Sequence, residues 1–188
     1  MAENRSYELS REMIDLLAAE CDPRRAVDTF TAGLSGLGGA YSEQAAAGVF
    51  EEYGRRWAGR TVELGEKYSE RTYEVLKEAA EKTGRLAFPH ILQRFVEIGY
   101  LATQPMEQLK IMANNHYHLA FRVEQCCTPA AIAASCGPGA ARELPCRHAC
   151  TSFLQELCRL LQMDAGLEVE SLRGEADYCQ FRLTNRKT

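Results

Sequence analysis

Seven of the eight cysteines lie in the last third of the chain, between residues 121 and 183. The eighth, Cys21, stands alone near the start. Cysteine is usually a sparse, small apolar residue of the core, so a cluster of this kind calls for an explanation. Metal binding, thiol chemistry and the lining of a ligand cavity are the three candidates. The clustered residues are Cys126, Cys127, Cys136, Cys146, Cys150, Cys158 and Cys179.

Cys146 and Cys150 are four residues apart in a segment of helical periodicity, so both thiols share one face of the helix. Two thiolates at this spacing can bind one soft metal ion such as zinc, and Cys179 on a nearby strand could complete the set. The helix start is also expected to lower the thiol pKa values, because its dipole favours an anion. Buried thiols that line a pocket are the alternative, since the two close cysteine pairs of strong zinc motifs are missing.

A nucleophilic cysteine is the enzymatic interpretation. Cys146 or Cys150 would attack an electrophilic carbon, with His148, His116 or His118 as the base. On a helix, His148 points about 200° away from Cys146, so it is not expected to join a metal site there. Alternatively, His116 and His118 are ordinary half-exposed residues of a hairpin with no catalytic role.

An iron–sulfur cluster held by Cys127, Cys136, Cys146 and Cys150 is a further alternative, although the spacing matches no ferredoxin pattern. The adjacent pair Cys126 and Cys127 follows a predicted strand. Its side chains then point to opposite faces, so both cannot serve one pocket while the strand stays regular.

The elements that must position these cysteines change in type along the chain. Helical periodicity predicts helices over residues 6–20, 23–34, 41–82 (in two pieces) and 88–98, with Gly99 ending the last one. Alternating segments then predict hairpins over 109–123 and 167–184, with helices over 128–134 and 143–163 between them. The predicted class is α+β: an antiparallel sheet of two hairpins packed against helices. Residues 1–83 form an N-terminal helical region, and residues 84–188 form the α+β domain.

Composition limits the partners. The 188 residues carry a net charge of −4 without a basic run, so no nucleic acid is expected to bind. No apolar stretch approaches the roughly 20 residues that span a bilayer, so no membrane partner is expected. The N-terminus lacks the apolar core of a signal peptide, which favours a cytoplasmic location with reduced cysteines. The N-terminal helices are expected to support a homodimer.

The segment GEADYCQF at residues 174–181 resembles the ending of 4-vinyl-reductase domains, in which a glycine, an acidic residue, an aromatic residue and a cysteine precede a phenylalanine. It is also similar to the ending of the aminothiazoline-carboxylate hydrolase family. Upstream, PCRH at residues 145–148 stands where these families open a helix with proline and cysteine. The cysteine–arginine pair looks closer to the hydrolase group. The resemblance covers residues 84–185.

The resemblance implies an enclosed, largely apolar pocket for a ligand. In sensor members a zinc ion lies near the pocket, held by cysteines and a glutamate. On that pattern Cys146 and Cys179 match two thiolate positions, and Glu168 or Glu170 matches the carboxylate. Ser171 stands at the third thiolate position and cannot replace it, which is a departure from the family pattern.

Two functions therefore remain open. The first is a binding protein for a small hydrophobic molecule, a tetrapyrrole such as haem, or a metal ion. The second is a cysteine-dependent hydrolase of a small ring compound, resembling aminothiazoline-carboxylate hydrolase, with Cys146, Cys150 and Cys179 near the reaction centre. The residues expected to line a ligand pocket are Phe95, Tyr100, His118, Phe121 and Cys127, although the aromatic ones also fit a plain core.

Overall fold

The computed structural model describes residues 11–36, 43–67, 90–103, 109–115, 117–142, 145–172 and 177–186. Predicted helical residues 6–10, 41–42, 68–82, 88–89 and 143–144, and His116, lie outside this part of the chain. The observed elements are, in chain order, α1 (Arg11–Glu20), α2 (Pro23–Gly36), α3 (Glu43–Lys67), α5 (His90–Thr103), β1 (Leu109–Asn114), β2 (His118–Glu124), α6 (Cys127–Arg142), α7 (Arg147–Leu160), β3 (Ala165–Ser171) and β4 (Tyr178–Asn185).

The four strands form one antiparallel sheet in the order β1-β2-β4-β3. The sheet and its helices confirm the predicted α+β class, and each predicted hairpin is present. The two hairpins join along β2 and β4, where Phe121 pairs with Phe181 and Val123 with Cys179. Asn115 shapes the first turn, because its side-chain oxygen accepts hydrogen bonds from the backbone N–H groups of the two residues that precede and begin β2 (2.9 and 3.1 Å).

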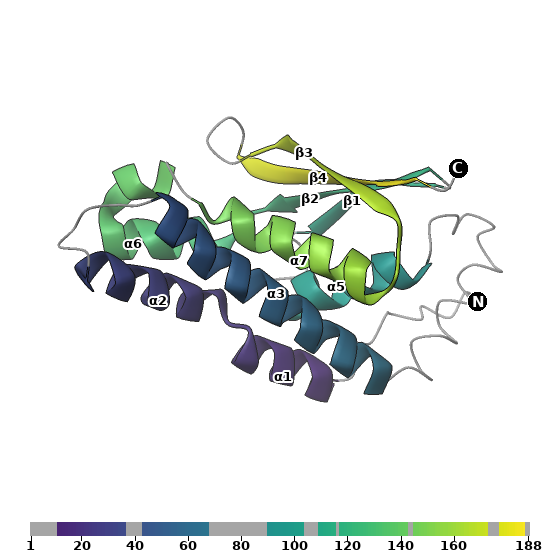
Figure 1. Ribbon diagram of the computed structural model, residues 1–188, viewed down its shortest axis with the longest axis horizontal. Helices are drawn as coiled ribbons and strands as arrows, with labels where there is room; N and C mark the ends of the chain where they lie inside the picture. The colour runs from purple at the N-terminus through teal and green to yellow at the C-terminus, as the bar shows by residue number, and fades with distance from the viewer. Residues whose placement is uncertain are drawn as a thin grey trace, which may run out of the picture.

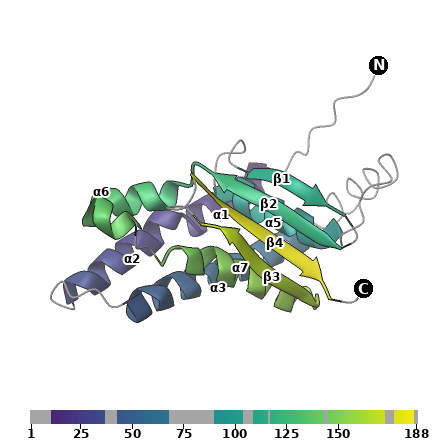
Figure 2. The ribbon, with the colours of Figure 1, turned by 90° about the horizontal axis from the view of Figure 1, so that it is seen from above.

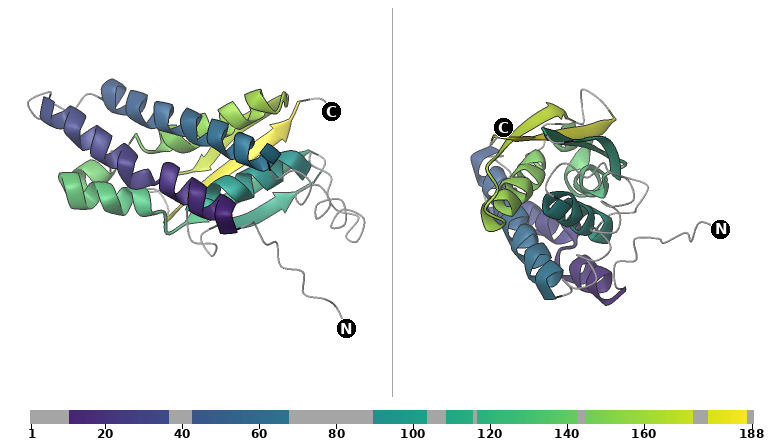
Figure 3. Two further views of the ribbon diagram at one scale, coloured as in Figure 1. Left: turned by 90° about the horizontal axis from the view of Figure 1, so that it is seen from below. Right: turned by 90° about the vertical axis from the view of Figure 1, so that its right-hand side faces the viewer.

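The helices lie under one face of the sheet (Figure 1), and the end-on view of Figure 3 shows the same layering. α3 packs against α7, and α1 packs against α5. α2 and α6 lie side by side beyond one end of the sheet (Figure 2). Among the described residues, each helix is too short or too polar to cross a membrane.

The core is continuous between the helices and the sheet. Trp57 of α3 stacks on Phe153 of α7 with ring centroids 3.9 Å apart, and Tyr100 of α5 meets both rings edge-on. Phe121 and Phe181 stack beneath the two central strands. Buried residues from both predicted segments, 1–83 and 84–188, contribute to this one core.

The observed helix boundaries differ from the predicted ones most clearly at α5, α6 and α7. α5 continues through Gly99 to Thr103, because Gly99 serves close packing there: a β-carbon would lie 2.2 Å from the Phe153 ring. α6 continues past residue 134 to Arg142, with a kink at Gly137, whose φ of 89° suits glycine. α7 begins only at Arg147, since residues 145 and 146 form a turn before it.

Candidate functional site: a thiol-lined cavity

A small cavity of about 40 Å³ lies between the helices and the sheet, at the end where β2 stops and β4 begins. Segments far apart in the chain meet there: the starts of α2, α6 and α7, the middle of α3, the end of α5 and both central strands. Among the residues that line it, Arg147 alone is charged. The lining residues are Pro23, Tyr53, Trp57, Tyr100, Val123, Cys126, Thr128, Pro129, Cys146, Arg147, Ala149, Cys150, Cys179 and Phe181.

The start of α7 supplies two of the four lining cysteines. Cys146 is the residue before the helix and already has helical backbone angles (φ −57°, ψ −24°). Cys150 follows one turn later, so both thiols reach the same cavity, as their spacing predicts. Arg147 between them forms an ion pair with Glu43 of α3 at 3.2 Å, which holds its charge at the rim.

The other two thiols come from the sheet side. Cys126 follows Gln125, whose positive φ of 50° turns the chain out of β2 and into α6. Cys179 lies on β4 opposite Val123, on the same strand face as the fully buried Phe181. The antiparallel register therefore brings Cys179 to the cavity together with the turn that carries Cys126.

Burial dominates the chemistry of Cys150. It raises the pKa of the thiol well above the usual range, and the nearby thiols of Cys126, Cys179 and Cys146 add to the rise. The prediction that the helix start lowers this pKa is therefore wrong for Cys150, because the loss of hydration outweighs the helix dipole. At neutral pH Cys150 is a thiol and not a thiolate.

Two tyrosines of the cavity wall differ in how their hydroxyl groups are satisfied. The Tyr53 hydroxyl donates a hydrogen bond of 2.6 Å to the backbone carbonyl of Cys21. The Tyr100 hydroxyl is fully buried beside the Cys150 thiol, and their contact lacks the geometry of a hydrogen bond. Neither this hydroxyl nor Nε1 of Trp57 has a hydrogen-bond partner among the described residues. A buried polar group without a partner is costly unless something else satisfies it.

Of the residues predicted to line a ligand pocket, Tyr100 lines this cavity and the other four lie outside it. Phe95 and Phe121 are buried core residues, and Phe95 packs against Gly65 of α3. His118 lies at the start of β2, next to Asn115, at the far end of the sheet from the cavity. Cys127 is the first residue of α6 and does not line the cavity, although the flanking Cys126 and Thr128 do.

The predicted base and the predicted carboxylate also lie elsewhere. His148 faces α3, with its Nδ1 atom 3.8 Å from Glu51. Glu168 is exposed on β3, opposite Arg182. Its neighbour Glu170 accepts hydrogen bonds from Gln180 and Arg182, and these lower the pKa of the Glu170 carboxyl.

A preformed metal centre is not found in the described part of the chain. No three His, Cys, Asp or Glu side chains there lie close enough together to hold one metal ion. The set proposed for an iron–sulfur cluster is divided, since Cys127 and Cys136 lie on α6 while Cys146 and Cys150 line the cavity. All eight cysteines, each of which lies in the described residues, are thiols in this structure. Zinc binding stays a prediction.

Sequence reasoning missed Cys126, Tyr53 and Trp57 as lining residues. Cys126 was ambiguous because only the turn at Gln125 decides which member of the adjacent cysteine pair reaches the cavity. Tyr53 and Trp57 lie four residues apart on the apolar face of α3, which is a detectable signal. That spacing does not show whether the two side chains line a cavity or pack in the core.

Comparison of the chain with protein-family models, with curated proteins and with solved structures gave no significant match.

Proposed function

We propose that the protein binds a small, mainly apolar molecule in the thiol-lined cavity. The observation that carries this proposal is the meeting of four thiols and the unpartnered Tyr100 hydroxyl at one enclosed space between helices and sheet. Apolar, concave sites with a few polar groups are typical of small-molecule binding. The resemblance of residues 174–181 to 4-vinyl-reductase domains supports the same class of function.

The size of the cavity limits the ligand. Its volume of about 40 Å³ is well below the roughly 150 Å³ of an engineered cavity that binds benzene. A tetrapyrrole would need far more room, so a ligand of a few heavy atoms is the better fit. One hydrogen-bonding atom on that ligand would satisfy the Tyr100 hydroxyl, and the thiols would give a soft, polarisable wall.

Binding fits this site better than hydrolysis. A nucleophilic cysteine needs a thiolate or an adjacent base. Burial keeps Cys150 protonated, and no histidine is among the described residues that line the cavity. A soft metal ion remains an alternative ligand, and it would require the four thiols to move closer together and to lose protons.

A cytoplasmic location and self-association through the N-terminal helices belong to the same proposal. A reducing compartment would keep the cavity thiols free of disulfides.

Three measurements on one purified preparation test the proposal: native mass spectrometry, elemental analysis and an absorption spectrum. We expect a colourless protein that carries a small organic molecule and no stoichiometric metal. Stoichiometric zinc would replace the proposal with a metal site, and strong visible absorption would replace it with haem or an iron–sulfur cluster.

Xenon tests the cavity directly, because it is a single apolar atom that enters dry cavities. Under xenon pressure, the NMR signals of Tyr100, Cys150 and Cys179 should shift. Cys179→Phe fills the cavity and should abolish these shifts. Cys136→Phe is the matched control, since Cys136 lies on α6 outside the cavity. A wild-type protein without shifts and without a co-purified molecule would refute the proposal.

A further inference from the structure

A second, polar hollow of about 650 Å³ lies between the corner of α1 and α2 on one side and α3 on the other. Its volume is within the roughly 300–1,000 Å³ range of small-molecule sites. Its side chains differ in kind from those of the thiol-lined cavity, because most of them are charged. They are Glu20, Cys21, Arg25, Thr29, Arg56, Gly59, Arg60 and Glu63.

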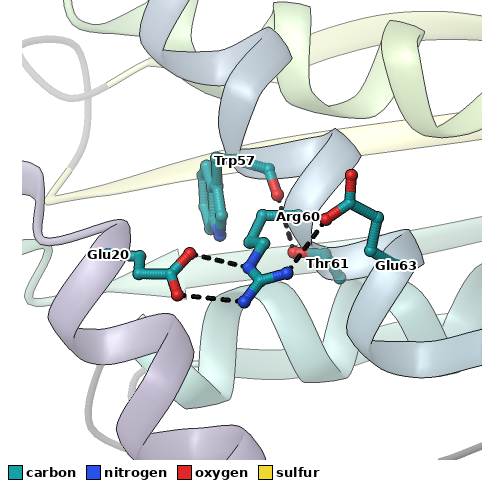
Figure 4. Close-up of polar contacts among 5 residues, drawn as sticks. All are labelled: Glu20, Trp57, Arg60, Thr61 and Glu63. Carbon is teal, nitrogen blue, oxygen red and sulfur yellow. Dashed lines mark hydrogen bonds and ion pairs between the residues drawn. The ribbon is translucent and has the colours of Figure 1, made fainter. Parts of the chain in front are cut away.

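One arginine of the hollow is fixed by carboxylates. Arg60 donates hydrogen bonds to both oxygens of Glu20, at 2.6 and 3.0 Å, and a third to Glu63 at 3.0 Å (Figure 4). This arrangement joins the end of α1 to α3. On the same helix, the buried Thr61 hydroxyl donates a hydrogen bond to the backbone carbonyl of Trp57.

The other two arginines have no such partners. The side chains of Arg25 on α2 and Arg56 on α3 form no hydrogen bond or ion pair with any described residue. Arg56 precedes Arg60 by one helical turn, and Arg25 precedes Thr29 by one turn, so both pairs face the hollow from opposite walls. Burial raises the pKa of the Cys21 thiol to about 11, and the guanidinium groups of Arg56, Arg60 and Arg25 each oppose that rise, so all three positive charges lie near Cys21.

We propose that this hollow binds a small multivalent organic anion, whose phosphate or carboxylate groups bridge Arg25 and Arg56. A guanidinium group matches both kinds of anion with two parallel hydrogen bonds. Arg60 and its two carboxylates hold the walls in place. Thr29 of α2, whose hydroxyl donates a hydrogen bond to the Arg25 backbone carbonyl, also lines the hollow. Glu20 and Glu63 already bind Arg60, so Arg25 and Arg56 are the guanidinium groups that remain to contact the anion, and the five charged side chains of the hollow carry a net charge of +1. This site is independent of the thiol-lined cavity.

Isothermal titration calorimetry with inorganic pyrophosphate and with citrate tests the site, each against chloride at matched ionic strength. We expect saturable binding of at least one of them. Pyrophosphate alone would indicate a phosphorylated ligand, and citrate alone would indicate a polycarboxylate. Binding of neither probe would overturn the proposal.

Variants decide whether the arginines are responsible. Arg25→Gln and Arg56→Gln should each weaken binding by about tenfold to a hundredfold, the loss of one charged hydrogen-bonding group. Arg55→Gln removes the same charge from the same helix, but Arg55 pairs with Glu51 and Glu52 outside the hollow. It should bind like the wild type. An equal loss of affinity in all three variants would mean that only the overall charge of the protein matters, and it would refute the site.

Discussion

Gly54 of α3 lies directly against Ala149 of α7, because a β-carbon on Gly54 would come 2.2 Å from the Ala149 carbonyl oxygen. The two helix backbones can approach this closely only without a side chain at residue 54. The approach brings Tyr53 and Trp57 of α3 to the same cavity as the cysteines of α7. The contact therefore positions one wall of the proposed site.

Gly54→Ala should destabilise the protein. The added methyl group meets backbone, which cannot rotate away, so we expect the free energy of unfolding to fall by about 1–3 kcal/mol. Gly48→Ala is the control on the same helix, because a β-carbon there meets nothing within 4 Å. It should raise the free energy of unfolding by about 0.5–1 kcal/mol through helix propensity. Urea denaturation distinguishes the two, and the same sign for both would contradict the close contact.

Tyr100→Phe should be neutral or stabilising in the protein without ligand. It removes a buried hydroxyl that has no described hydrogen-bond partner, and a group of this kind costs about 1–3 kcal/mol. The same variant should bind the proposed ligand more weakly. Tyr53→Phe is the opposite case, since it deletes the hydrogen bond to the Cys21 carbonyl and should cost about 1 kcal/mol. Thermal unfolding of both variants measures the contrast. A loss of stability in Tyr100→Phe as large as that in Tyr53→Phe would show that the hydroxyl is satisfied.

The sequence predicted the hairpins well, because alternation and turn residues are local signals. The turn at Asn115 and the strands on either side of it lie where the pattern indicates. The pairing of β2 with β4 is a contact between distant segments, and it alone brings Cys179 next to Val123. Local patterns cannot supply that register.

The site was only partly predictable for the same reason. Cys146 and Cys150 share a face by helical spacing alone, and both line the cavity. The prediction that Gly99 ends a helix is wrong, because a glycine that ends a helix and a glycine that admits a neighbouring ring look alike in sequence. Only the Phe153 ring, from a helix more than fifty residues later, distinguishes them.

The stacked pair of Phe121 and Phe181 should hold the two hairpins together. Both side chains are fully buried, and their ring centroids are 5.5 Å apart. Replacement of either by alanine should cost about 3–5 kcal/mol. A double-mutant cycle with leucine at each position should give a coupling of about 0.5–1.5 kcal/mol, the usual value for an aromatic pair. Additive effects would contradict a specific contact between the rings.

Buried thiols should make the protein sensitive to alkali. Burial raises the pKa of Cys21 and of Cys158 from 9.0 to about 11. In the unfolded chain these thiols lose their protons near pH 9.0, whereas in the folded protein they keep them until about pH 11. Between pH 9.0 and about pH 11, ionisation of these thiols therefore stabilises the unfolded state relative to the folded state. The contribution of these groups is fully present below pH 9.0 and is lost as the pH rises to about 11.

Cys158→Ala should flatten this decline. The variant lacks one thiol with a raised pKa. Across the same pH window, the decrease in its free energy of unfolding should therefore be smaller than the decrease in the wild type, by roughly 1–2 kcal/mol. Urea denaturation at intervals from neutral pH to about pH 11 measures both curves. Only the slope is compared, because the smaller side chain lowers stability at every pH. Val62→Ala is the control, because Val62 is likewise buried but has no ionisable group, so this variant should keep the wild-type slope. A decline in Cys158→Ala as steep as that of the wild type would show that the buried thiol does not link folding to pH.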